Sequence, residues 1–204
     1  MVMQFTTADY ERIAEAIREA EKETSGEIVC ALARRSSDYA YAPPLWAAFI
    51  ALVAPWPMAV FTDLSTKTIY AAQIAIFIFS AAIISWPPLR FALTPRLVKR
   101  TRAQRAAIEQ FHLLGVAGTK GRTGVLIFVS FAEHYARIVA DDGLAGKISN
   151  EEWQSALDPL LACMREGRCA DGFVAAIREC ARLLARCAPP GAGENELPDK
   201  IHVM

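Results

Sequence analysis

Residues 123–140 read TGVLIFVSFAEHYARIVA, and this stretch decides the fold. Its first half, Thr123–Phe131, is rich in Val, Ile and Phe, as a buried strand is. In its second half, His134–Ala140, Tyr, Arg and Val alternate with Ala, Ile and Ala, a period of two that indicates a strand. Ala132-Glu133 leaves two residues for a turn. The stretch therefore predicts an antiparallel β-hairpin.

A helix and a further strand are predicted near the start of the chain. Thr6–Thr24 carries apolar residues at helical spacing on one face and charged residues on the other, and Thr6 or Thr7 can cap it. After Ser25-Gly26, Glu27–Arg34 is almost continuously apolar, which suits a strand buried on both faces. We expect this strand to lie beside the hairpin in one sheet.

Helices are predicted on both sides of the hairpin in sequence. Pro95–Leu114 is a charged amphipathic helix, and Ser149, with a Glu three residues on, begins a helix that ends near Glu166. Asp171 is predicted to cap a last helix that runs to about Cys187. The remaining residues, 189–204, are polar with prolines and are expected to be extended. Strands and helices together predict an α/β fold.

Two stretches between the first strand and the hairpin carry no charged residue. They are Leu45–Phe61 and Ile69–Leu89, joined by a short polar link that holds Asp63 and Lys67. Each is about long enough to cross a hydrocarbon core of roughly 30 Å. The alternative is an apolar helical hairpin inside a soluble core, but such helices normally keep a polar face. We therefore predict a transmembrane hairpin over residues 43–93.

Basic residues after the second stretch predict the orientation of this hairpin. Arg90, Arg96, Lys99, Arg100, Arg102 and Arg105 lie within the window where the positive-inside rule operates. The C-terminal side is therefore predicted to be cytoplasmic. Because two crossings return the chain to the side it left, the N-terminus is expected there too. The prediction is a two-helix protein of the cell inner membrane, with the link around Asp63 facing the other side.

Overall composition restricts the classes of partner and compartment. The 22 basic and 22 acidic residues give no net charge, so no basic excess favours a nucleic-acid partner. The number of cysteines is five, which is odd, and they form no CxxC pair. The N-terminal residues lack the basic and apolar regions of a signal peptide. Reduced thiols in the cytoplasm are the expected state.

Several short motifs together resemble the TPM domain family. They are Thr24-Ser25-Gly26-Glu27-Ile28 after an amphipathic helix, Thr123-Gly124-Val125-Leu126-Ile127-Phe128-Val129, a strand with Arg137-Ile138, and Gly143-Leu144-Ala145-Gly146. The resemblance covers about residues 13–38 and 102–184, and the membrane hairpin resembles an insertion found in some bacterial members. It implies a three-layer α/β/α sandwich. The domain is then discontinuous, over residues 1–42 and 94–188, with 189–204 as an extended tail.

The resemblance also implies candidate activities, since some family members are described as acid phosphatases or as divalent-metal binders. This chain departs from the soluble members at two positions. It has Ala132-Glu133 where they often carry two acidic residues in the hairpin turn, and Asp141-Asp142 where they often carry Gly-Tyr. Catalytic residues are therefore not transferred from the family to this chain.

Asp141 and Asp142 are the main candidates for a site. Two carboxylates at the end of a strand offer hard oxygen ligands for Ca²⁺ or Mg²⁺, and Asp38 and Glu27, which flank the first strand, are candidate further ligands. The alternative is that Asp141-Asp142-Gly143 simply makes a turn, because Asp bonds its own backbone and Gly permits positive φ. The residues alone favour the turn, since no complete ligand set with known spacing is present.

Two other motifs carry weaker chemistry. The glycine-rich stretch 118–124 lies between a helix and a strand, whereas a phosphate-binding loop lies between a strand and a helix. A connector is therefore expected there. Cys163 and Cys169 lie near Arg165 and Arg168, which could lower a thiol pKa.

Two functions from different classes remain after these observations. The first is a membrane-anchored, non-catalytic module that binds a membrane-protein partner at the cytoplasmic face, with a metal ion organising a loop. The second is a divalent-metal-dependent phosphatase at the membrane surface, for which Asp141, Asp142, Arg122 and Arg137 are available without a recognisable nucleophile. The first is favoured. The bilayer is the expected partner in both.

Overall fold

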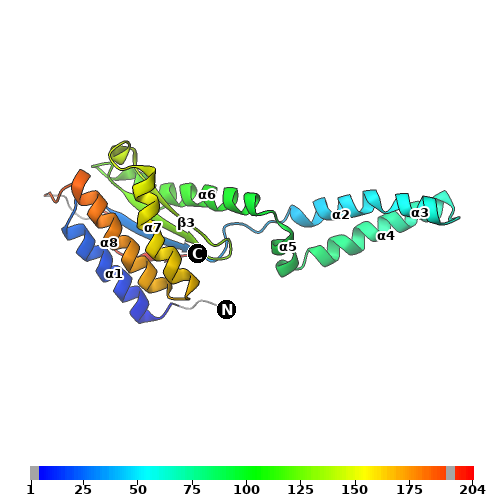
Figure 1. Cartoon of the computed structure of the whole chain (residues 1–204), viewed down its shortest axis with the longest axis horizontal. Helices are drawn as coiled ribbons and strands as arrows, with labels where there is room; N and C mark the ends of the chain where they lie inside the picture. Colours follow the sequence, from blue (N-terminus) through cyan, green and yellow to red (C-terminus); the bar gives the residue numbers. More distant parts are fainter. Residues whose placement is uncertain (1–4, 192–195) are drawn as a thin grey trace. The chain divides into compact units, whose positions relative to one another are not determined.

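The protein is described from a computed structural model that covers residues 5–191 and 196–204. The chain divides into two compact units. One unit combines Met1–Ser36 with Arg100–Met204 and holds the sheet, and the other is Ser37–Lys99. Figure 1 labels the helices and strands of both. We call them the sheet unit and the hairpin unit and describe each by itself.

The sheet unit has four strands in the order β3-β2-β1-β4. They are β1 (Ile28–Ala33), β2 (Val125–Ser130), β3 (Tyr135–Ala140) and β4 (Ile201–Val203). β1 pairs with β2 in parallel from Ile28 opposite Val125, and β2 pairs with β3 in antiparallel. This arrangement confirms the predicted β-hairpin and its place beside the first strand. The turn is longer than predicted, because Phe131–His134 all lie outside the strands and His134 takes a φ of 49°.

β4 was not predicted as a strand. The tail was expected to be extended, but three of its residues pair in parallel with β1, from Cys30 opposite Ile201 to Leu32 opposite Val203. A backbone N–H of Met204 also donates to the carbonyl of Leu32 at 2.9 Å. The tail therefore completes the edge of the sheet beside β1.

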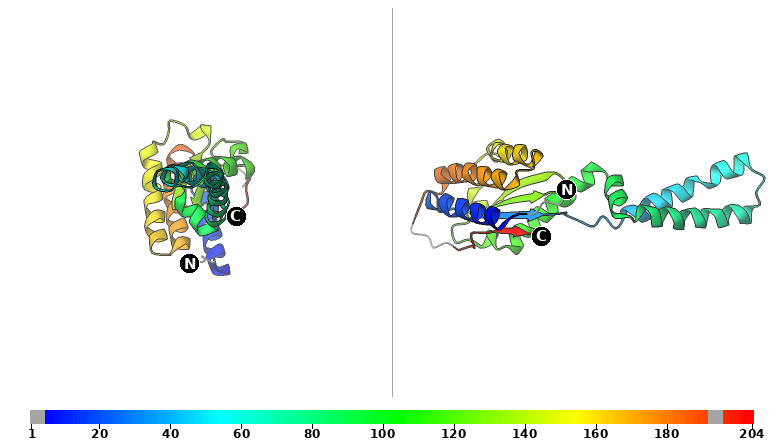
Figure 2. Two further views of the ribbon diagram at one scale, coloured as in Figure 1. Left: turned by 90° about the vertical axis from the view of Figure 1, so that its right-hand side faces the viewer. Right: turned by 90° about the horizontal axis from the view of Figure 1, so that it is seen from below.

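Two helical layers cover the two faces of the sheet, as the three-layer prediction requires. On one face lie α1 (Thr7–Lys22), α7 (Asn150–Arg165) and α8 (Cys169–Cys187). On the other face lies α6 (Arg96–Leu113), through Ala107 and Phe111. The right-hand view of Figure 2 shows α6 and α8 on opposite sides of the strands. Short 3-10 turns, Val116–Gly118 and Asp142–Leu144, flank β2 and β3.

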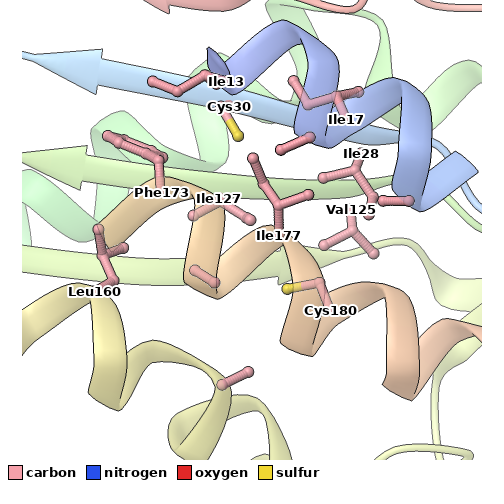
Figure 3. Close-up of a cluster of buried hydrophobic side chains, with 14 of the residues drawn as sticks. Ile13, Ile17, Ile28, Cys30, Val125, Ile127, Leu160, Phe173, Ile177 and Cys180 are labelled. Carbon is pink, nitrogen blue, oxygen red and sulfur yellow. The ribbon is translucent and has the colours of Figure 1, made fainter. Parts of the chain in front are cut away.

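Apolar cores on both faces of the sheet explain why β1 and β2 are apolar at every position except Ser130. Ile28 and Cys30 of β1 point toward α1 and α8, whereas Val29 and Ala31 face the layer that contains α6. Figure 3 shows Ile13 and Ile17 of α1 and Ile177 of α8 meeting above these strands. Every residue of both strands is buried. A strand covered on both faces loses the alternation that a half-exposed strand shows.

The helix starts follow the predicted caps at two of three places. Thr6 and Ser149 both form capping boxes, with Asp9 and Glu152 returning the hydrogen bond. The third prediction is wrong, because α8 begins at Cys169 and Asp171 lies inside its first turn. There the carboxylate of Asp171 pairs with Arg12 of α1 at 2.5 Å. Its negative charge also interacts favourably with the positive, N-terminal end of the helix dipole.

The hairpin unit consists mainly of helices with apolar surfaces. α2 (Ala42–Val53) and α3 (Pro55–Phe61) make the first arm, with Pro55 at the break, and α4 (Thr66–Ile84) makes the second. α5 (Pro87–Leu93) follows. α2 packs on α4, and its buried residues include Ala47 and Ala51, which lie one helical turn apart. Small side chains at this spacing let two helix backbones approach closely.

Candidate functional site

Three of the four predicted ligands, Glu27, Asp141 and Asp142, lie at one end of the sheet, where β1 and β2 begin and β3 ends. The N–H of Val125 donates to the carbonyl of Glu27 at 2.8 Å, and the N–H of Asp141 donates to the carbonyl of Gly124 at 2.9 Å. Glu27, Gly124 and Asp141 therefore lie side by side in the backbone ladder. This end of the sheet holds the amino ends of the two parallel strands. Open α/β sheets usually bind ligands at the carboxyl ends instead.

Asp141 and Asp142 share one cation, the guanidinium of Arg122. An Nη of Arg122 lies 2.8 Å from Asp142 Oδ2 and 3.5 Å from Asp141 Oδ1. Asp141 is only 5% exposed, whereas the side chains of Asp142 and Arg122 are largely exposed. Arg122 itself has a φ of 50° and sits in the loop before β2. This group, the Asp141–Arg122 site, brings together two of the four predicted ligands.

The carboxylate of Asp141 has two different oxygens. Oδ1 accepts a hydrogen bond from the N–H of Asp142 at 2.6 Å, which is the bond expected if the Asp-Asp-Gly stretch makes a turn. Oδ2 is buried and has no hydrogen-bond partner among the described residues. A buried oxygen without a partner costs free energy, which a bound cation or a water molecule would recover.

Glu27 is engaged with the tail instead of with Asp141. Its Oε1 accepts the N–H of Glu196 at 3.2 Å. Burial raises the pKa of Glu27, and backbone N–H groups of Glu196 and Leu197 oppose that rise. The fourth predicted ligand, Asp38, is exposed and belongs to the hairpin unit. Over residues 5–191 and 196–204, no group of three or more His, Cys, Asp or Glu side chains is arranged to hold a metal ion. The metal site therefore stays a prediction.

Glu27 is part of an acidic group that the sequence did not reveal. We call Glu21, Glu27, Glu196 and Asp199 the tail acid cluster. Glu21 Oε1 accepts the N–H of Ile28 at 3.3 Å, and Glu21 shares a side-chain hydrogen bond with Asp199. Burial, together with the negative charges of Glu27 and Asp199, raises the pKa of Glu21 to about 8. No spacing signal links residues near 21 with residues near 199, because the pairing of β4 with β1 brings them together.

The tail acid cluster lines an open hollow of about 780 Å³. Glu21, Glu27 and Glu196 lie on its wall together with Lys22 and Lys120. The carboxylate of Glu196 accepts the backbone N–H of Lys120 at 3.2 Å, which ties the tail to the loop before β2. These contacts hold the tail in place, so the cluster acts as a structural anchor for β4.

A smaller cluster of polar side chains lies at the opposite end of the sheet, where β1 and β2 end and β3 begins. There the hydroxyl of Ser36 donates to Ser130 Oγ at 2.6 Å, and Ser130 Oγ donates to a carboxylate oxygen of Glu133. The backbone N–H of Ser36 also donates to Glu133 Oε1 at 3.1 Å. Glu133, the acidic residue of the hairpin turn, thus fixes the chain at the last residue before the hairpin unit.

Cys169 does not match the predicted reactive thiol. Burial raises the pKa of Cys169 to about 11, which is opposite to the predicted direction. Arg168 is instead paired with the carboxylates of Glu166 and Asp171. All five cysteines are free. Cys169 and the fully buried Cys30 and Cys180 act as small apolar core residues.

Comparison with known proteins finds a family match for part of the chain. The model of the TPM domain matches residues 88–183, which include α6, β2, β3, α7 and most of α8. Over these residues the chain is similar to the TPM domain. The match begins before the Gly124 and Gly143 motifs and ends after them, which confirms the resemblance that those motifs indicated.

A solved structure has a fold similar to that of this chain. It is the NMR structure of the BA42 protein from the psychrophilic bacterium Bizionia argentinensis. The likeness has a TM-score of 0.62 at 20% sequence identity, and it covers 100% of this chain and 99% of that one. At this identity the likeness shows the fold. A search of curated proteins gave no match.

Proposed function

We propose that this TPM domain is anchored in the bacterial inner membrane by the hairpin unit and acts as a non-catalytic interaction module at the cytoplasmic face. The observation that carries the anchoring is the exposure of the two apolar arms. Ala42–Phe61 and Thr66–Ile84 are each long and apolar enough to cross a membrane. Of the most apolar 18-residue stretch in each, only 11% and 6%, respectively, is buried. A core helix of a soluble protein would be mostly buried.

The exposed side chains of the arms are large. Phe49, Leu52 and Trp56 of the first arm and Ile74, Ile78 and Phe79 of the second are all more than half exposed. A soluble monomer rarely leaves a continuous apolar patch beyond a few hundred Å² in water. Removing each such side chain from water contributes about 1.5–3 kcal/mol. A lipid bilayer therefore accounts for this surface.

The sheet unit supports a non-catalytic interaction role, because the polar side chains near the candidate site are bound to other groups of the same unit. Arg122, the cation nearest the two aspartates, is held by both of them. Glu27 and Glu196 bind backbone N–H groups of the tail and the β2 loop. A phosphatase needs such groups to converge on a phosphate instead. The expected partner is another protein of the same membrane.

Membrane fractionation tests the anchoring. We expect the full chain to sediment with membranes and to resist extraction by high salt and by alkaline carbonate. A matched variant with Ile74→Lys, Ile78→Lys and Phe79→Lys interrupts the second arm and should lose this resistance. Recovery of the unmodified chain in the soluble fraction without detergent would contradict the proposal.

A partner assay and a phosphatase assay separate the interaction role from catalysis. The detergent-solubilised full chain should retain a membrane protein in fixed proportion after affinity purification, and it should not hydrolyse p-nitrophenyl phosphate with Mg²⁺ or Ca²⁺ above background. Hydrolysis that the Asp141→Asn variant abolishes would overturn the interaction role.

The second candidate, a metal-dependent phosphatase, is favoured by one observation. Asp141 is buried beside Arg122 and has a carboxylate oxygen without a hydrogen-bond partner among the described residues. Ca²⁺ takes roughly 6–8 oxygens, so Asp141 and Asp142 would need further ligands from water or substrate. Calorimetry of the detergent-solubilised chain should detect millimolar or tighter Ca²⁺ binding if the site is real. The double variant Asp141→Asn/Asp142→Asn should lose it, and Asp158→Asn on α7 should not.

A further inference from the structure

The first turn of α6 lies at the base of the membrane hairpin. The ammonium of Lys99 lies 3.8 Å from the centre of the Phe91 ring, and that ring packs edge-on against Tyr39 at 5.8 Å. The indole N–H of Trp46, in the first half of α2, donates to the carbonyl of Leu93 at 3.2 Å. These contacts belong to the hairpin unit. They place the end of α5 beside the first half of α2, and the first turn of α6 against α5.

α6 carries one kind of charge over its first ten residues. Arg96, Lys99, Arg100, Arg102 and Arg105 fall in this stretch, and the sequence has no Asp or Glu between Asp63 and Glu109. The four arginines are exposed. The buried face of the helix is made by Ala103, Ala107 and Phe111. The basic side chains therefore surround the part of the helix that the sheet does not cover.

An exposed apolar residue lies among these basic residues. Leu97 is 78% exposed, although it directly follows Arg96 in the first turn of α6. Exposure of a single leucine needs no explanation in a soluble helix. Here it occurs beside the basic residues, next to the base of a hairpin whose arms are themselves exposed and apolar. Basic side chains with an interleaved apolar one are the pattern of a helix at a membrane surface.

We propose that the basic face of α6, Arg96–Arg105, binds the phosphate headgroups of anionic lipids in the cytoplasmic leaflet, with Leu97 inserted among the acyl chains. This rests on the proposed membrane anchoring. Anionic headgroups attract basic residues next to a membrane helix, with about a fivefold preference per Lys or Arg. The attraction falls off within about 8 Å at physiological salt. The contact of Lys99 with Phe91 holds the first turn of α6 against α5, at the base of the hairpin.

A fluorophore on α6 tests the proposal in the full chain. Leu97→Cys is labelled with bimane in a background where the half-buried thiols are removed by Cys163→Ser and Cys187→Ser. The protein is reconstituted into vesicles of phosphatidylcholine alone or with phosphatidylglycerol. Quenching by spin labels on the acyl chains should increase at least threefold with the anionic lipid. A label at Leu113→Cys, which is 70% exposed at the other end of α6, should change little.

Two charge variants decide whether the basic face is responsible. Arg96→Gln/Arg100→Gln/Arg105→Gln should abolish the increase at residue 97. Arg165→Gln/Arg178→Gln/Arg182→Gln removes the same charge from α7 and α8 and should leave the increase intact. Equal quenching in the two vesicle types, or equal loss in both triple variants, would overturn the proposal.

The same samples distinguish this proposal from the anchoring on which it rests. Flotation with vesicles of phosphatidylcholine alone depends on the hairpin and not on lipid charge. If the chain floats with these vesicles but phosphatidylglycerol does not increase the quenching at residue 97, the anchoring stands and the lipid contact is refuted. A chain that does not float would refute both.

Discussion

Two glycines beside the Asp141–Arg122 site have no room for a side chain. A Cβ on Gly124 would lie 2.3 Å from the carbonyl oxygen of Val116, and one on Gly143 would lie 2.2 Å from that of Arg122. Both contacts are with backbone, which cannot move without disturbing β2 and the end of β3. This close approach gives a physical reason for the Gly124 and Gly143 motifs that the family resemblance rests on.

Substitution of these glycines should destabilise the sheet unit. We expect Gly124→Ala and Gly143→Ala each to lower the free energy of unfolding by about 2–4 kcal/mol, since a forced backbone shift lies in the upper range for single substitutions. Gly118→Ala is the control, because nothing lies within 4 Å of its Cβ position. The measurement is urea unfolding in detergent, followed by Trp153 fluorescence after Trp46, Trp56 and Trp86 are replaced by Phe. Equal midpoints for all three variants would contradict the packing.

The raised pKa of Glu21 predicts how stability depends on pH. Its pKa rises from 4.5 to about 8, so between these values the folded protein holds a proton that the unfolded chain has lost. Stability from this group is complete below about pH 4.5 and is lost as the pH rises through 8. The limit is about 1.4 kcal/mol per pH unit, and partial solvation of Glu21 reduces it.

Glu21→Gln should flatten this dependence, because the amide is neutral at every pH. In the same urea assay, the unmodified protein should lose more stability between pH 5 and pH 8 than the Glu21→Gln variant. Glu19→Gln, an exposed neighbour on α1, should behave like the unmodified protein. Parallel pH profiles for the unmodified protein and Glu21→Gln would show that Glu21 is not the group that titrates.

At the scale of elements, local patterns predicted most of the fold. The capping boxes at Thr6 and Ser149, the apolar runs of β1 and β2, and the alternation in β3 each have a local cause. β4 has none, because its three residues become a strand only by pairing with β1. The cap predicted at Asp171 failed because α8 begins two residues earlier, at Cys169. The tail acid cluster depends on β4, so it could not be predicted either.

The packing of α8 on the sheet should dominate the stability of the sheet unit. Ile177 is fully buried between α1 and the strands, as Figure 3 shows. Ile177→Ala leaves a cavity and should lower the free energy of unfolding by about 2–5 kcal/mol. Leu113→Ala removes a similar side chain that is 70% exposed and should change it by less than about 0.5 kcal/mol. The urea assay described above measures both, and similar losses would contradict the assignment of the core.

At the scale of the whole molecule, the chain joins two units that differ in where their apolar side chains lie. The sheet unit buries its apolar strands between helical layers, whereas the hairpin unit leaves its apolar arms exposed. The candidate site belongs to the sheet unit, apart from Asp38, which lies in the other. The carboxylates that do meet, Asp141 and Asp142, both belong to one unit and are held by its own Arg122.

The orientation of the hairpin gives a prediction for the intact protein. Six basic residues follow the second arm, from Arg90 to Arg105. At the other end of the arms, the charged residues are Asp63 in the link and Lys67 in the first turn of α4. Because Lys and Arg are retained on the cytoplasmic side, both termini should face the cytoplasm and the link should face the periplasm. Green fluorescent protein fused after Met204 should fluoresce, and alkaline phosphatase fused after Thr62 should be active. The exchanged fusions should both be silent. An active phosphatase after Met204 would reverse the topology, and it would place the basic face of α6 on the side without the predicted anionic leaflet.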